Sequence, residues 1–248
     1  MEHAEYEVMY RVEDVHWWYQ GMQRITRQVL DRLLAQHELQ PPLKILDAGC
    51  GTGAVMKYMS AYGEVTGFDF SAEALRFSRQ RGLTRLTRAS AVEITFAADQ
   101  FDLIVSFDVI CAIGAKDEVA LREFRRILKT GGLVVLRLPA YDWLRSRHDE
   151  VAHNVHRFTR DELAAKLARC GFEPVHLSYA NTVLFPLVLI KRLSERVLKP
   201  APSGSDLAID PGPLNRVFRA ILYAEAPLVR SVGLPFGLTV VAVGRRGD

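Results

Sequence analysis

The sequence has few cysteines and no hydrophobic run long enough to span a membrane. Its 3 cysteines are odd in number and have no CxxC or Cys/His spacing, which argues against a disulfide framework or a zinc site. The start, MEHAEYEVMYRVED, is charged and lacks the apolar core of a signal peptide. Residues 181–190 are the most hydrophobic stretch, but they are too few to cross a bilayer and include Pro186. We therefore expect a cytoplasmic protein without a transmembrane helix.

An excess of one charge is also missing. The 248 residues contain 32 Lys and Arg against 29 Asp and Glu, scattered among one another, and the net charge is +3 at pH 7. Because there is no basic stripe and no recognisable RNA-binding appendage, nucleic acid is not an expected partner. With 49% hydrophobic residues, the chain has the composition of a globular protein and the length for one α/β domain with an elaboration.

Short β-rich runs alternate with helical patterns in the first part of the chain. The expected strands are 44–48, 64–69, 83–89, 101–107 and 132–139. The expected helices lie near 53–61, 72–81 and 117–129. This alternation predicts a parallel sheet.

The pattern continues toward the C-terminus with one long interruption. A helix is expected over 159–170, beginning at Thr159 with Glu162 three residues later, as in a capping box. FEPVHLSYAN and GLTVVAVG (237–244) read as strands. The segment between them is too long for a loop, so we expect a helical insertion with a flexible break near 200–213.

The loop after the first strand, within LKILDAGCGTG, has glycine at every second position. Gly49, Gly51 and Gly53 remove three side chains, so a ligand can lie against the main chain. A strand, a glycine turn and a helix N-terminus together place unpaired N–H groups at the carboxyl edge of a sheet. GCGTGA also satisfies the dinucleotide pattern GxGxxA, so the glycines alone do not choose between nucleotide-like cofactors.

Two carboxylates narrow the choice of ligand. Asp47 stands beside the loop and either orients it or accepts hydrogen bonds from a ligand ammonium, where a pyrophosphate would be repelled. Asp69 ends the next strand, 22 residues after Asp47, and could accept bonds from both hydroxyls of a ribose. The ligand should therefore carry a cation and a ribose.

Four motifs in order resemble those of class I S-adenosylmethionine-dependent methyltransferases: DAGCGTG, GFDFS, FDLIVSFDVI and RRILKTGGLVVLRLP. The resemblance implies an α/β, Rossmann-like, mostly parallel sheet of seven strands with the last strand antiparallel, and S-adenosylmethionine lying over the loop. The expected segments are an N-terminal helical extension or lid, a donor-binding core, a helical cap insertion and a final core strand, at residues 1–40, 41–180, 181–235 and 236–248.

The same resemblance assigns donor contacts. Gly49, Cys50 and Gly51 would contact the methionine part, Asp69 the ribose and Phe70 the adenine face. Many relatives carry an aspartate for recognition of the adenine N6 group where this chain has a serine in RASAVE. The backbone of the following residues would recognise the adenine instead. The expected donor-binding residues are Trp18, Tyr19, Asp47, Gly49, Cys50, Gly51, Gly53, Asp69, Phe70, Ser90, Ala91, Val92 and Phe107.

The acceptor side is expected near the histidines that follow the fifth strand, His148, His153 and His156. Methyl transfer needs a base only where the acceptor loses a proton, and histidine suits that task near neutral pH. HWWYQG, DEVAHNVHRFT and LPFGLTVVAVGRR resemble a narrower set of bacterial enzymes linked to glycan or natural-product pathways. In that set the position of His153 is typically histidine and that of His156 commonly arginine. His153 is thus the expected base, Asp108 is a second catalytic candidate, and HxxxxHxxH lacks a typical metal-ligand spacing.

HWWYQG and the insertion are expected to meet over the donor as a lid, with Trp18 or Tyr19 facing the cofactor. Core packing is the alternative for at least one of these aromatics, since consecutive helical residues point in different directions. The apolar run of the insertion, followed by Lys191 and Arg192, is either a cap helix, an acceptor tunnel or a membrane-surface contact. The expected acceptor is a small molecule or a lipid- or sugar-linked one.

Two other functions remain open. A nicotinamide-dependent oxidoreductase would use the same sheet, but it would leave Asp47 and RRILKTGG unexplained. A non-catalytic donor-binding scaffold would keep the glycine loop and lose the acceptor chemistry. DVICA, where many relatives read DVLEH, gives the scaffold some support, because Cys111 and Ala112 replace an acid and a histidine. Cys111 itself reads as a small buried residue, and Arg137 as the partner of a nearby acid.

Overall fold

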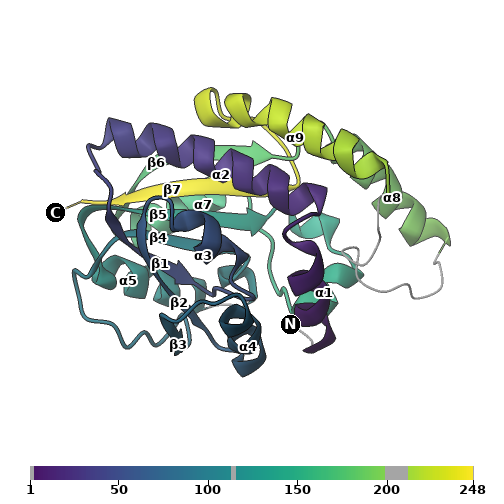
Figure 1. Ribbon diagram of the computed structural model, residues 1–248. Helices are drawn as coiled ribbons and strands as arrows, with labels where there is room; N and C mark the ends of the chain where they lie inside the picture. The colour runs from purple at the N-terminus through teal and green to yellow at the C-terminus, as the bar shows by residue number, and fades with distance from the viewer. Residues whose placement is uncertain (1–2, 113–115, 199–211, 248) are drawn as a thin grey trace.

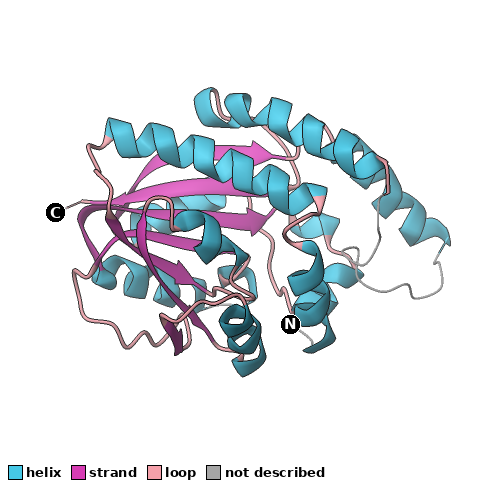
Figure 2. Ribbon diagram, in the orientation of Figure 1, coloured by secondary structure: helices cyan, strands magenta, loops and turns pink. Residues whose placement is uncertain are grey.

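The structure is a computed structural model that describes residues 3–112, 116–198 and 212–247. A seven-stranded sheet with the order β3-β2-β1-β4-β5-β7-β6 forms its centre, with helices on both faces (Figure 1, Figure 2). The strands are β1 (Leu43–Ala48), β2 (Gly63–Asp69), β3 (Leu86–Arg88), β4 (Phe101–Phe107), β5 (Leu128–Pro139), β6 (Phe172–Ala180) and β7 (Thr239–Arg246). β7 is antiparallel to both of its neighbours, β5 and β6, and the pairs among β1 to β5 are parallel. The expected Rossmann-like fold is confirmed.

The four helices predicted near 53–61, 72–81, 117–129 and 159–170 are confirmed, with small shifts at their ends. They are α1 (His3–Val12), α2 (Trp17–Gln36), α3 (Ala54–Met59), α4 (Ala72–Gln80), α5 (Asp117–Ile127), α6 (Arg147–Ala152), α7 (Arg160–Arg169), α8 (Phe185–Leu198) and α9 (Leu214–Ser231). α5 ends two residues before the expected position 129, because Leu128 is already extended and pairs with Phe101 of β4. β3 is shorter than expected because its pairing with β2 is confined to 67–69.

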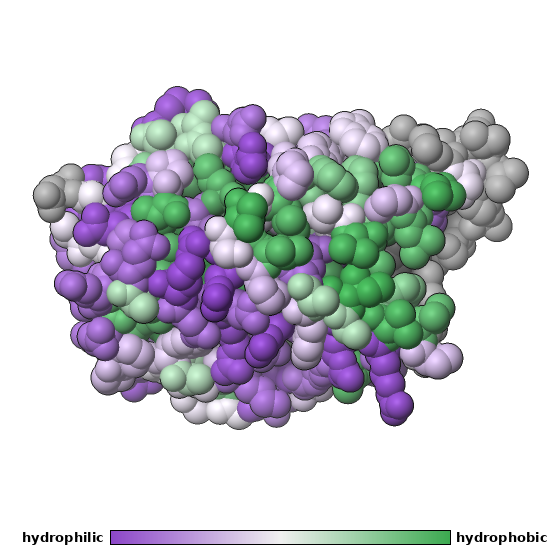
Figure 3. All heavy atoms as spheres, turned by 90° about the horizontal axis from the view of Figure 1, so that it is seen from above, coloured by the Kyte–Doolittle hydropathy of each residue, from purple (hydrophilic) through white to green (hydrophobic). Residues whose placement is uncertain are grey.

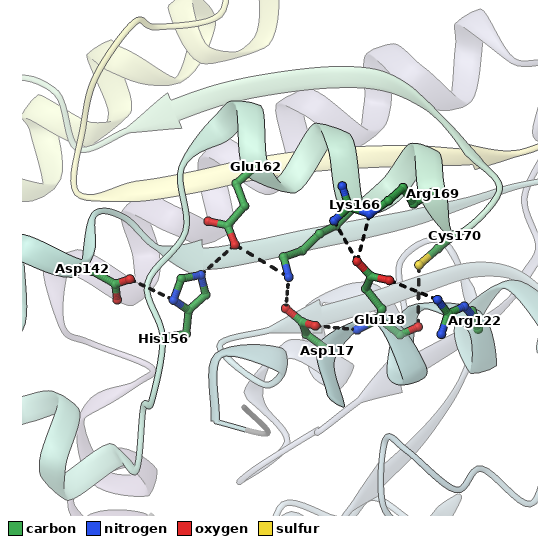
Figure 4. A network of polar contacts seen from close by, with 9 residues as sticks. All are labelled: Asp117, Glu118, Arg122, Asp142, His156, Glu162, Lys166, Arg169 and Cys170. Atoms are coloured by element: carbon green, nitrogen blue, oxygen red, sulfur yellow. Dashed lines mark hydrogen bonds and ion pairs between the residues drawn. The ribbon is translucent and has the colours of Figure 1, made fainter. Parts of the chain in front are cut away.

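Capping at α7 follows half of the expected pattern. The Thr159 hydroxyl accepts a hydrogen bond from the backbone N–H of Glu162, so the N-cap is confirmed. The Glu162 carboxylate contacts His156 instead of reaching back to the cap (Figure 4). A reciprocal capping box is found at α6, between Ser146 and Asp149.

The two faces of the sheet bury separate apolar clusters. On one face α2 contributes Met22, Ile25, Val29, Leu30 and Leu33, all with no exposed surface. Each buried side chain of this size contributes about 1.5 to 3 kcal/mol. On the other face α5 and α7 pack against alternate residues of the same strands. Most of α2 is therefore part of the core.

The insertion between β6 and β7 consists of α8 and α9, as expected for a helical segment. α9 lies alongside α2 (Figure 1) and buries Leu222, Ala226 and Val229. The contact is close, since a Cβ on Gly21 would stand 2.2 Å from Leu222. The expected break at 200–213 falls, except for its last two residues, outside the described part of the chain. Within the described residues, no helix is long and apolar enough to cross a membrane.

Candidate active site

A cavity of about 1490 Å³ lies at the carboxyl edge of the parallel strands. The strand ends form its floor, and residues of α1, α2, α8 and α9 form its walls. The expected donor-binding and catalytic residues line it, with one exception. Gly53 instead packs against α4, where a Cβ would stand 2.4 Å from Leu83 and 2.9 Å from Ser78.

The glycine loop is tightly folded and its N–H groups are used. Gly49 and Gly51 have φ angles of 82° and 52°, which favour glycine. The N–H groups of Gly49 and Cys50 donate to the Phe68 carbonyl at 2.9 and 2.8 Å, and that of Gly51 donates to Asp69. The expectation of unpaired N–H groups at these positions is therefore wrong, because the loop folds back onto the end of β2. Fewer donors remain for a pyrophosphate than a dinucleotide site would offer.

Asp69 is held by the backbone around it. Oδ2 accepts from the N–H of Gly51 at 2.9 Å and Oδ1 from that of Ser71 at 2.8 Å. Burial raises the pKa of Asp69 and the two backbone bonds oppose this rise. The cap of α4 is Ser71, whose hydroxyl accepts from the N–H of Ala74. Asp69 is thus fixed at the edge of the cavity, and the carboxylate oxygens still have lone pairs for ligand hydroxyls.

Asp47 is a buried carboxylate that lacks a partner on one oxygen. It is 2% exposed, and no described residue bonds to Oδ2. Burial, with a further contribution from Asp69, raises the pKa of Asp47 to about 8. A buried acid with an unsatisfied oxygen is costly for the fold, and a ligand cation would relieve that cost. Glycines without side chains and an acid without a partner both fit a donor with an ammonium group.

Arg137 at the end of β5 was expected to pair with an acid, and it does so with Asp108. Its Nη2 lies 3.2 Å from Asp108 Oδ2. The guanidinium also lies over two aromatic rings, Trp18 at 4.9 Å and Phe107 at 4.4 Å. Trp18 thus presents a ring face to an internal cation while lining the cavity. Tyr19 lies beside Trp18, with ring centroids 5.0 Å apart, and burial raises its pKa.

The N-terminal segment meets the insertion at one wall of the cavity. The backbone N–H of Trp17 donates to Asn215 Oδ1 at 2.7 Å. The Trp17 ring meets the Phe218 ring edge-on, with ring centroids 5.3 Å apart. Trp17 and Phe218 both line the cavity. The N-terminal segment and the insertion, which were expected to form a lid, are therefore in contact.

The sequence predicted an N-terminal helical extension, but not that residues of α1 and the turn after it contact the glycine loop. The Thr52 hydroxyl donates to the Glu13 carboxylate, which also pairs with Arg81 at 2.6 Å. Met9 lies against Gly51, because a Cβ there would stand 3.0 Å from its methyl group. The spacing of Tyr6, Met9 and Glu13, three and four residues apart on one helical face, was the available signal.

The histidines of the acceptor side are separated by the structure. His153 is exposed, has a φ angle of 58° and lines the cavity. His156 lies between Asp142 and Glu162, with ring nitrogens 2.9 and 2.8 Å from their carboxylates (Figure 4). The side chain of His148 lies outside the described residues. The described part of the chain contains no group of three or more residues able to hold a metal ion.

The network that fixes His156 also joins α5 to α7 (Figure 4). Lys166 on α7 lies 2.7 Å from Asp117 on α5, and it also reaches Glu162 at 3.7 Å.

Cys111 is fully buried, its thiol donates to Asn154, and burial raises its pKa well above the ordinary value. The thiol is therefore poorly suited to act as a nucleophile.

One wall of the cavity is apolar and continues to the surface. Leu184, Leu187 and Val188 of α8 and its approach line the cavity, together with Lys191 and Arg192. Leu187 is also 55% exposed. Seen from above, hydrophobic side chains gather at the end of the molecule that holds α8 (Figure 3). The cavity thus opens beside an apolar surface with basic residues nearby.

Comparison with known proteins shows what this chain is similar to. Residues 46–136 match a family model described as a methyltransferase domain. Residues 46–136 are thus similar to methyltransferase domains. It is similar to the malonyl-[acyl-carrier protein] O-methyltransferase of Enterobacter lignolyticus (strain SCF1), with 32% identity over 51% of this chain and 51% of that protein. It is also similar to the demethylmenaquinone methyltransferase of Staphylococcus aureus (strain MRSA252), with 32% identity over 42% of this chain and 46% of that protein.

The chain spans about half the length of the curated relatives it matches. Among solved structures, an S-adenosylmethionine-dependent methyltransferase from Thermotoga maritima shares the fold over 98% of this chain and 95% of that chain, with a TM-score of 0.56 and 18% identity.

Proposed function

We propose that the protein transfers a methyl group from S-adenosylmethionine to a small-molecule or a lipid- or sugar-linked acceptor. One observation carries the proposal: two buried carboxylates, Asp47 and Asp69, flank a glycine loop whose own N–H groups are already bonded. Such a site suits a ligand with a cation and ribose hydroxyls, and it disfavours the pyrophosphate of a nicotinamide cofactor.

In this proposal the chain positions the reactants more than it reacts with them. S-adenosylmethionine supplies an electrophilic methyl group on a sulfonium sulfur. Asp69 and the loop hold the nucleoside, while α1 and the first turn of α2 exclude water from the cavity. Because methyl transfer is an in-line displacement, most of the rate gain comes from such positioning. His153, with Asp108 as the second candidate, would accept a proton where the acceptor must lose one.

The acceptor class rests on the apolar wall formed by α8. The two curated relatives act, by name, on malonyl-[acyl-carrier protein] and on demethylmenaquinone. Leu187 and Ile190 of α8 are 55% and 66% exposed and lie three residues apart on one face, and Val183, just before the helix, is 59% exposed. An apolar face next to basic residues is the pattern of a helix that lies on an anionic membrane surface. We therefore propose a peripheral membrane contact. Nucleic acid is not a proposed partner.

The domain division is proposed as predicted, with lid residues in 1–40, a donor core at 41–180, a cap at 181–235 and a last strand at 236–248. The contact of Trp17 with Phe218 supports a joint lid. A cytoplasmic location is also part of the proposal, and the free thiols of all three cysteines agree with a reducing compartment.

Titration calorimetry with S-adenosylhomocysteine and with NAD tests the donor assignment. We expect micromolar binding of the first ligand and none of the second, and the reverse result would favour the oxidoreductase. Transfer of labelled methyl groups to a panel of hydroxyl, amine and carboxyl compounds, including lipid extracts, then tests catalysis. Binding without transfer to any member of the panel would favour the scaffold alternative.

A further inference from the structure

Arg137 is a buried cation on the floor of the cavity. Its side chain is 7% exposed, yet it lines the cavity. Within the described residues, its guanidinium makes one side-chain hydrogen bond, to Asp108 at 3.2 Å, and its Nε has no partner. A guanidinium has five N–H donors, so most of this one's capacity is unused.

Two aromatic rings hold the guanidinium in place. Phe107 is the last residue of β4, just before Asp108, and Trp18 lies in the first turn of α2. Their ring centroids lie 4.4 and 4.9 Å from the Arg137 guanidinium carbon. A planar cation fixed in this way is prepared for a planar anion such as a carboxylate.

The strand register places Arg137 in line with the carboxylates of the donor site. Asp47 is aligned with Gly67 of β2 and Val105 of β4. Two residues further along, Asp69, Phe107 and Arg137 lie at one level across β2, β4 and β5. Since residues two apart face the same side of a sheet, all of these side chains share one face. The level from Asp69 to Arg137 covers three strand spacings, roughly 14 Å in all.

Charges therefore follow a fixed order along the sheet edge. Asp69 on β2 comes first, Asp47 on β1 second and Arg137 on β5 last, and Arg137 is close enough to Asp47 to lower its pKa. S-adenosylmethionine carries ribose hydroxyls, an ammonium group and a carboxylate in the same order, the last two on one carbon. An acid and a guanidinium on one face are the matched pair for this zwitterion.

We propose that Arg137 binds the carboxylate of the methionine part of the donor, with Asp108 as the residue that positions it. This inference rests on the proposed function. An acidic acceptor is the other source of a carboxylate. The order of charges favours the donor, because an acid and a guanidinium on one sheet face match the ammonium group and the carboxylate that the donor carries on one carbon.

The test compares S-adenosylmethionine with decarboxylated S-adenosylmethionine, which keeps the sulfonium and the ammonium group and lacks only the carboxylate. Calorimetry is carried out on the wild type, Arg137→Met and Arg137→Lys. We expect the wild type to prefer the complete donor by roughly 10- to 100-fold. Arg137→Met should abolish this preference and leave the affinity for the decarboxylated ligand unchanged within about threefold. Arg137→Lys, which keeps the charge and loses the planar fork, should retain part of it.

Three results would overturn the inference. If Arg137→Met keeps the wild-type preference, the guanidinium does not contact the donor carboxylate, and loss of turnover only with acidic acceptors would assign it to the acceptor. If both ligands lose affinity equally, Arg137 shapes the cavity through Trp18 and Phe107. If the wild type binds neither ligand, the proposed function fails and the inference fails with it.

Discussion

The two sides of the cavity are built in different ways. The donor side consists of strand ends and the loop after β1, where Asp69 is fixed by two backbone bonds and Asp47 is 2% exposed. The acceptor side consists of α8 and the start of α9, where Leu187 is 55% exposed. Strand register determines the first, while helices inserted late in the chain form the second. The proposed donor side is thus set by the sheet, whereas the proposed acceptor side is formed by the side chains of two helices.

The largest expected effect is on the donor side, from Gly51→Val. The φ angle of 52° disfavours a branched residue, and the new side chain would meet Met9 and occupy space beside the loop. We expect no detectable binding of S-adenosylhomocysteine by calorimetry. Gly82→Ala is the matched control, because Gly82 has a φ angle of 83° with no atom within 4 Å of its Cβ position and does not line the cavity. Normal binding by Gly51→Val would mean that the ligand does not lie against the loop.

Asp69→Ala comes next and should weaken donor binding by roughly 2 to 3 kcal/mol, the scale for hydrogen bonds to a charged group. The variant also frees the N–H groups of Gly51 and Ser71. Asp69→Asn, which keeps one acceptor oxygen, should lose less. Affinities come from calorimetry and folding from circular dichroism. Unchanged affinity in a folded Asp69→Ala protein would remove Asp69 from the donor site.

Asp47→Asn should stabilise the protein while weakening the donor site. The pKa of Asp47 is raised from 3.8 to about 8 in the folded state, so the folded state binds more protons between these values. The free energy of unfolding therefore falls as the pH rises from about 4 to 8 and is level above. We expect the free energy of unfolding of Asp47→Asn to exceed that of the wild type by at least about 1 kcal/mol at pH 8, and by less at pH 5. Denaturant unfolding at both pH values measures this, and equal pH dependence would contradict it.

The smallest expected effect is on the acceptor side, from Ile190→Glu. This side chain is 66% exposed and lies outside the cavity lining, so donor binding should not change. Binding to vesicles with anionic lipid should fall roughly 3- to 10-fold, because an apolar anchor is replaced by an acid. Val232→Glu is the control, since Val232 is 77% exposed at the end of α9. Equal losses in both variants, or no vesicle binding by the wild type, would remove the membrane contact.

The same contrast explains what could be predicted from the sequence. Strand ends carry their motifs locally, so the sequence pattern predicted that Asp47, Asp69 and the loop lie together, and they line one cavity. Glu13 and Arg137 were not recognised as site residues, because their contacts join segments far apart in the chain, such as Glu13 with Arg81 and Arg137 with Trp18. Gly53 shared the glycine pattern, yet it packs on α4 because the loop turns away before it. The bonded N–H groups depend on how the loop folds onto Phe68, which spacing does not encode.

The central claim is that the buried carboxylate of Asp47 binds the ammonium group of the donor. Proton release on ligand binding measures this most directly. Asp47, with a pKa of about 8, is mostly protonated at pH 7 before binding, and a ligand ammonium favours the ionised form. Calorimetry of S-adenosylhomocysteine at pH 7, in buffers with different ionisation enthalpies, gives the number of protons released. We predict close to one proton for the wild type and none for Asp47→Asn. Tight binding without proton release by the wild type would contradict the account.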